Sequence, residues 1–133
     1  MTEPNQQSWT VEDLLQGKPA EVIALFTHFM DAVQACGPVE VQPLKDRVVL
    51  RGSRRIFASA APMARTLRGH LNLPRRVDDP RLSHVEPLTK RLFFHRFTIA
   101  SAAELDEEFI SWLHEAYAVG QGAHLQASPP SSS

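Results

Sequence analysis

The spacing of apolar residues along the chain changes twice, and this change limits the fold more than any other feature. From Pro19 to Gly37 apolar side chains recur every three to four positions, which is the spacing of an amphipathic helix. Residues 39–99 contain short alternating runs broken by proline and glycine, which are typical of strands. Helical spacing returns between Ser101 and Gly120. Strands grouped between helices predict an α+β fold with a mainly antiparallel sheet.

The expected elements are a short N-terminal helix, a long helix, about four to six short strands and a C-terminal helix. Thr10 and Asp13 have the spacing of a capping box that would start the first helix. Ser101 and Glu104 have the same spacing and predict that the last helix starts there. We expect the two long helices to cover one face of the sheet.

Several short stretches have the composition of strands. Gly52 and Ser53 lie between two of them and predict a hairpin with a two-residue turn. Pro87 predicts an edge position for the stretch before it, because proline cannot donate a hydrogen bond to a ladder. The stretches are residues 39–41, 47–51, 54–60, 65–73, 84–87 and 91–99.

A length of 133 residues fits one domain. We expect that domain to span residues 9–122 and residues 1–8 and 123–133 to be disordered, because these ends lack apolar periodicity. The N-terminal segment lacks the basic and apolar regions of a secretory signal, and no apolar run approaches the roughly 18 residues of a membrane span. Cys36 is the single cysteine and excludes an intramolecular disulfide. These features predict a cytoplasmic protein.

The charge of the chain is segregated along the sequence. Residues 1–44 carry six acids and one lysine, and residues 101–133 carry five acids and no base. Residues 45–100 carry thirteen lysines or arginines against four acids, a net charge of +9. Most of these bases are arginines, whose planar guanidinium suits bidentate contacts with phosphate or carboxylate.

The recognisable catalytic and metal-binding motifs are missing from the sequence. Cys36 falls near the end of a helix, where the helix dipole opposes a thiolate, so a small packed side chain is the better interpretation. The six histidines show no metal-ligand spacing, and Gly120 and Gly122 follow a helix instead of opening one. We therefore predict no metal and no cofactor, and an enzyme is the less favoured class.

Three interpretations of the basic strands remain open. The arginines can pair with the acidic helices as ordinary solvated ion pairs, which are worth about 0–1 kcal/mol when exposed. They can bind a small anion, or they can bind nucleic acid if Phe57, Phe93 and Phe97 are exposed for base stacking. Strand alternation divides the arginines between both faces of the sheet, so the net charge alone does not decide among these.

Seven short stretches together carry a family resemblance. They are WTVEDL at 9–14, ACGPV at 35–39, GSRR at 52–55, VDDPR at 77–81, RLFFHRF at 91–97, ELDEEF at 104–109 and AYAVG at 116–120. These stretches resemble the domain-of-unknown-function 5655 family of bacterial proteins. The resemblance covers about residues 8–125 and implies a compact α+β module without an assigned activity. It also implies ligand-contacting roles for the basic positions Lys45, Arg55, Arg91 and His95.

The leading hypothesis is a non-enzymatic binding module that holds an anionic ligand or an acidic protein segment on the basic strand region. The first alternative is a nucleic-acid-associated protein, whose binding would weaken steeply with salt. A homodimeric interaction protein is the second, because residues 92–99 are apolar on both faces of the strand. An uncharacterised enzyme that uses His95 and Arg91 is the third.

Overall fold

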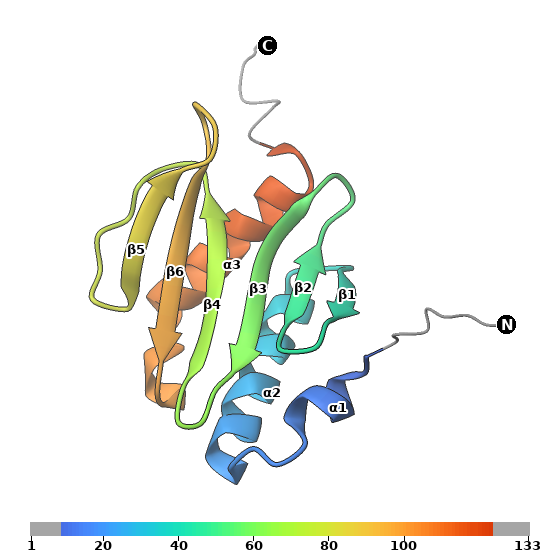
Figure 1. Cartoon of the computed structure of the whole chain (residues 1–133). Helices are drawn as coiled ribbons and strands as arrows, with labels where there is room; N and C mark the ends of the chain where they lie inside the picture. The colour runs from blue at the N-terminus through green and yellow to red at the C-terminus, as the bar shows by residue number, and fades with distance from the viewer. Residues whose placement is uncertain (1–8, 124–133) are drawn as a thin grey trace, which may run out of the picture.

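The structure is a computed structural model that describes residues 9–123. The segments 1–8 and 124–133 lie outside the described residues, so the disorder expected for the chain ends stays a prediction. The described chain forms two layers, a six-stranded sheet and the helices packed behind it (Figure 1). The elements are α1 (Val11–Leu15), α2 (Ala20–Ala35), β1 (Glu40–Pro43), β2 (Val48–Arg51), β3 (Ile56–Pro62), β4 (Leu67–Leu73), β5 (Leu82–Pro87), β6 (Phe93–Ile99), the 3-10 helix η2 (Ala102–Glu104) and α3 (Glu107–Gly120).

The strands follow the order β1-β2-β3-β4-β6-β5, and every neighbouring pair is antiparallel. After β4 the chain forms β5 at the edge of the sheet and returns as β6 between them (Figure 1). The predicted α+β class with an antiparallel sheet is confirmed, and β5 is an edge strand as Pro87 indicated. None of the described helices is long and apolar enough to cross a membrane.

Both long helices pack on one face of the sheet, as expected from their apolar stripes. Phe29 of α2, Phe97 of β6 and Phe109 of α3 are fully buried and form the centre of the core. The ring centroid of Phe97 lies 5.4 Å from that of Phe29 and 5.3 Å from that of Phe109. Aromatic pairs at this separation are stabilising beyond their burial of area. The opposite face of the sheet has no helix on it (Figure 1).

The start of the last helix was predicted too early. Ser101 and Glu104 do form a capping box, but it caps η2 and not the long helix. Leu105 is buried and has a non-helical backbone (φ −86°, ψ 60°), so the chain bends at this residue. The long helix α3 begins at Glu107, where the Asp106 side chain accepts a hydrogen bond from the Phe109 amide.

The two-residue hairpin turn predicted at Gly52 and Ser53 is wrong. Four residues connect β2 and β3, and the Gly52 amide donates to the Arg55 carbonyl at 2.9 Å. The amides of Arg54 and Arg55 donate to the Gly120 carbonyl at the end of α3, at 2.8 and 3.1 Å. This connection is therefore held by a distant helix, and its length was not decided by local turn chemistry.

A β-bulge next to this connection turns Phe57 toward the helices. Leu50 pairs with Ala58 and Arg51 pairs with Ile56, so Phe57 is an extra residue in β3. Its ring is fully buried and contacts Tyr117 of α3 edge-on, at 5.6 Å between centroids. Phe57 and Phe97 are both inaccessible, so neither offers the stacking surface that a nucleic-acid-binding sheet requires.

Candidate functional site

A groove of about 560 Å³ lies on the face of the sheet that carries no helix, the face turned toward the viewer in Figure 1. It runs over β3 between side chains of β2 on one side and β4 on the other, and Phe94 and Arg96 of β6 lie at its outer border. Its lining residues are Asp46, Arg47, Val49, Ile56, Ser59, Ala61, Met63, Arg68, Gly69, His70, Phe94 and Arg96.

The groove exists because β3 presents small side chains on this face. Ser59 and Ala61 form the floor, and the strand register places Ser59 between Val49 of β2 and His70 of β4. Ala61 pairs with Arg68 on β4. Neighbouring strands lie about 4.8 Å apart, so longer side chains on β2 and β4 rise on either side of a low central strand.

Arginines stand on both sides of Ala61. Arg68 faces the groove from β4, and Arg47 lines it from the residue just before β2. Arg47 contacts Asp46 at 3.4 Å, but their side chains are 48% and 73% exposed, so this ion pair contributes little. Within residues 9–123 neither Arg68 nor Arg96 forms an ion pair with a carboxylate. The groove therefore carries more positive than negative charge.

His70 occupies the middle of the groove as a neutral side chain. Its Nδ1 lies 2.6 Å from Ser59 Oγ, and its ring stacks on Phe94 at 5.0 Å and 10°. Burial, and then the nearby charge of Arg47, lower the pKa of His70 from 6.5 to about 4. The imidazole is thus uncharged near neutral pH. If Ser59 donates to Nδ1, the Nε2 of the same ring is a hydrogen-bond donor.

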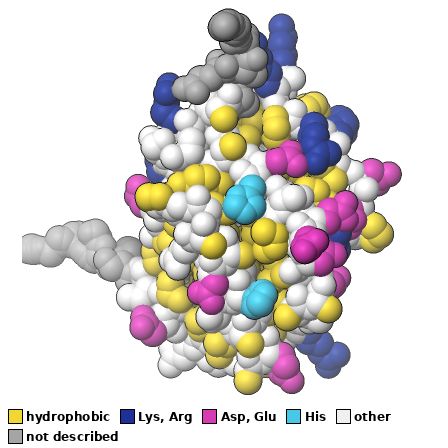
Figure 2. Space-filling model, turned by 180° about the vertical axis from the view of Figure 1, so that it is seen from behind, with side chains coloured by type: hydrophobic (Ala, Val, Ile, Leu, Met, Phe, Trp, Pro, Cys, Tyr) yellow, Lys and Arg dark blue, Asp and Glu magenta, His cyan; other side chains and the backbone are white. Residues whose placement is uncertain are grey.

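The opposite side of the molecule has a different charge pattern. Figure 2 shows that side, where acidic side chains are spread over the surface and gather on its right flank, while basic side chains lie mainly toward the upper and lower ends. The first turn of α2 contains Glu21, and that of α3 contains Glu107 and Glu108. These acidic residues therefore lie on the side of the sheet opposite the groove, which Arg47, Arg68 and Arg96 line.

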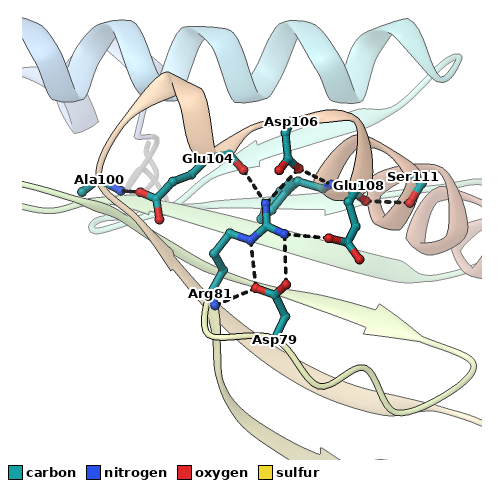
Figure 3. Close-up of polar contacts among 8 residues, drawn as sticks. Asp79, Arg81, Ala100, Glu104, Asp106, Glu108 and Ser111 are labelled. Carbon is teal, nitrogen blue, oxygen red and sulfur yellow. Dashed lines mark hydrogen bonds and ion pairs between the residues drawn. The ribbon is translucent and has the colours of Figure 1, made fainter.

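Arg81 is a basic residue whose contacts are with the protein itself. Its guanidinium contacts Asp79 at 2.9 Å, Asp106 at 2.8 Å and Glu108 at 3.1 Å, and donates to the Glu104 carbonyl (Figure 3). Its side chain is only 12% exposed and lies 4.8 Å from the Trp112 ring. All of its N–H groups have acceptors, so the ion-pair interpretation of the basic residues is correct for Arg81.

None of the four basic positions implied by the family resemblance lines the groove. Lys45 is exposed in the turn between β1 and β2, at one end of the sheet. Arg55 and Arg91 lie in the β2–β3 and β5–β6 connections, both at the other end. The Arg55 Nε is buried without a hydrogen-bond acceptor. The fold does not bring these three residues into one pocket, and their ligand-contacting roles stay a prediction.

His95 faces the helices and is fully buried. Its Nε2 accepts a hydrogen bond from the Val77 amide at 3.0 Å, and its Nδ1 lies 3.0 Å from the Phe93 carbonyl, to which it must donate. These two contacts fix one neutral tautomer, and burial lowers the pKa of His95. His95 thus connects β6 to the segment before β5 and is not exposed to the groove.

The sequence did contain a signal for the groove. Arg68 and His70 are two positions apart in the stretch 65–73, so strand alternation alone places them on the same face. What the sequence lacked was the strand order, which brings Arg47 and Arg68 to opposite sides of Ala61.

A metal site and a cysteine nucleophile are two other kinds of site to consider among residues 9–123. No group of three or more His, Cys, Asp or Glu side chains in this part of the chain could hold a metal ion. Cys36 is half-buried at the end of α2, its Sγ donates to the Ala32 carbonyl, and burial raises the pKa of its thiol. A raised pKa makes the thiol a poor nucleophile.

Comparison with known proteins identifies a family. A family model described as "Domain of unknown function (DUF5655)" matches residues 11–120, which is most of the chain. No curated protein and no solved structure matches the sequence.

Proposed function

The chain belongs to the family described as a domain of unknown function (DUF5655), and because that description assigns no activity, we propose a function from the groove: the protein is a binding module for a small anionic ligand. The ligand lies over Ala61 and Ser59, between Arg47 and Arg68. The proposal keeps the anion-binding module expected from the basic strands and puts its site on the open face of the sheet.

The observation that carries the proposal is the placement of Arg47 and Arg68 on either side of a small residue. Arg47 and Arg68 line the groove on either side of Ala61, so an anion that lies over Ala61 can accept charge-assisted hydrogen bonds from both. Arg68 has no carboxylate partner within the described residues, so a ligand does not have to displace one. A volume of about 560 Å³ is also within the range of ligand sites.

Ser59 and His70 complete the site without adding charge. The Ser59 hydroxyl and the His70 imidazole form a hydrogen-bonded pair on the floor and wall of the groove. In the tautomer in which Ser59 donates to Nδ1, the neutral imidazole offers its Nε2 proton to a ligand oxygen without electrostatic repulsion between His70 and the arginines.

The test is the thermal stability of the protein with phosphate, carboxylates and nucleotides at low salt, because a ligand that prefers the native state must stabilise it. Arg68→Gln should weaken binding of any stabilising anion by about 10-fold or more, the effect of losing one charge-assisted hydrogen bond. Arg54→Gln is the matched control, because Arg54 is exposed and lies outside the groove. If no anion raises Tm, or if both variants behave alike, the proposal is wrong.

Nucleic acid remains the second candidate, because Phe94 lies beside Arg96 on the open face. However, the Phe94 ring already stacks on His70 and meets the His84 ring edge-on, which limits its use for stacking with a base. Binding to a short DNA or RNA probe that weakens steeply with salt would favour this candidate over a small ligand.

A further inference from the structure

We infer that the ligand of the groove is a small organic monocarboxylate with an apolar body, and not an inorganic anion. This inference rests on the proposed function and adds the chemical class of the ligand. The carboxylate lies between Arg47 and Arg68, and the apolar body extends along β3 toward Ile56.

The size of the groove supports a ligand with a body. A water molecule occupies about 30 Å³ in the liquid, so an inorganic anion of a few water volumes fills a small part of 560 Å³. Ile56 and Ala61 are the first and sixth residues of β3, so they are separated by about 15 Å at the rise of a strand. A ligand that contacts both the arginines and Ile56 therefore needs an extended body.

The surface between the arginines and Ile56 is apolar. Val49, Ile56 and Phe94 line this part of the groove, and Ile56 is 37% exposed although it is a large aliphatic side chain. An apolar body that covers this surface would remove it from water, which is favourable in proportion to the area buried. An inorganic anion would leave it exposed.

The charges favour one negative group at one end. Arg47 and Arg68 flank Ala61, whereas the side chain at the centre of the groove, His70, is uncharged. Asp46 borders the groove beside Arg47 and would repel a second negative charge there. Arg96 lies on β6, on the far side of His70 from the floor, and contacts Phe94. A single carboxylate with an uncharged body fits this arrangement better than a dianion.

The experiment is calorimetric titration of the full chain with acetate, butanoate, hexanoate and octanoate, each below its micelle concentration. Each added CH₂ that is buried should tighten binding by about 4-fold. Octanol and octylamine are the controls for the charge and should bind far more weakly than octanoate. Inorganic phosphate is the control for a bare anion.

Two variants separate the two ends of the ligand. Ile56→Ser should flatten the dependence on chain length and leave acetate binding unchanged, while Arg68→Gln should weaken all the carboxylates. Leu88→Ser is the matched control for Ile56→Ser, because Leu88 is also an exposed large apolar side chain (49%) but lies outside the groove. It should leave the whole series unchanged.

The outcomes distinguish this inference from the proposed function. If phosphate or acetate binds as tightly as octanoate, and Arg68→Gln weakens both, the anion site stands and the organic ligand class is overturned. If no anion binds, the proposed function itself fails.

The same carboxylate chemistry occurs at the end of a peptide, so a tripeptide ending in leucine is compared with its amide. Binding of the free-acid peptide at least 10-fold tighter than octanoate would overturn the small acid in favour of a protein C-terminus.

Discussion

Replacement of Arg81 by methionine tests whether a partly buried arginine holds the β4–β5 segment to the start of α3. Arg81 lies just before β5 and reaches across to Asp106 and Glu108 at the N-terminus of α3 (Figure 3). Methionine keeps an apolar stem of similar length but removes every N–H donor and the charge that lies over the Trp112 ring.

The expected loss of stability follows from the exposure of each partner. Asp79 is 16% exposed and loses a two-oxygen contact with Arg81, which leaves a shielded carboxylate without its cation. The Glu104 carbonyl also loses a charged donor. Breaking a buried pair costs about 3–5 kcal/mol and an exposed pair about 0–1 kcal/mol. Asp106 and Glu108 are 50% and 61% exposed and regain water, so we expect a total of about 3 kcal/mol.

The assay is urea denaturation at pH 7, followed by the fluorescence of the two tryptophans. Arg75→Met is the matched control, because Arg75 also forms a bidentate pair, with Glu115, but is 54% exposed. It should lower the free energy of unfolding by less than about 1 kcal/mol. A double-mutant cycle of Arg81→Met with Asp79→Asn should give a coupling energy above about 1.5 kcal/mol. Equal losses for Arg81→Met and Arg75→Met would refute the reasoning.

Two further predictions concern the sheet. In Gly69→Ala the added Cβ would collide with the Ser59 carbonyl oxygen and lie 2.6 Å from Phe97 Cζ. We therefore expect the free energy of unfolding, measured by chemical denaturation, to fall by about 2–4 kcal/mol. A fall below about 1 kcal/mol would contradict the close approach of β3 and β4. Burial lowers the pKa of His70 from 6.5 to about 4, so the unfolded chain binds a proton at higher pH than the folded chain. Stability should therefore fall as pH drops from about 6.5 to about 4, by about 3 kcal/mol from His70 at ~1.4 kcal/mol per pKa unit. His70→Gln should remove the His70 part of this pH dependence. The part that comes from His95, whose pKa is also lowered, should remain. If the stability of the variant depends on pH as that of the unmodified protein does, a neutral His70 is contradicted.

Local patterns in the sequence determined the elements and the faces on which their side chains lie. The apolar stripe of α2, the alternation in β4 and β6 and the capping box at Thr10 all depend on residues a few positions apart, and all appear in the structure. Arg68 and His70, two positions apart in β4, therefore share a face by strand alternation alone.

Features that depend on distant residues were missed. The β2–β3 connection has four residues because the Gly120 carbonyl and the Gln121 side chain hold its amides. The box at Ser101 was identified correctly, but the burial of Leu105 in the core bends the chain before α3 starts. In both places a tertiary contact outweighs a local preference of about 1 kcal/mol.

The candidate site divides in the same way between sequence and structure. Periodicity alone determined that the basic strands present arginines on two faces. Only the tertiary structure decided which face the helices cover and which strands are neighbours. The strand order put Arg47 and Arg68 on either side of Ala61. It left three other basic residues at the ends of the sheet, namely Lys45, Arg55 and Arg91. The physical reason is that strand order is set by burial of the whole apolar face against α2 and α3, a property that no short segment carries by itself.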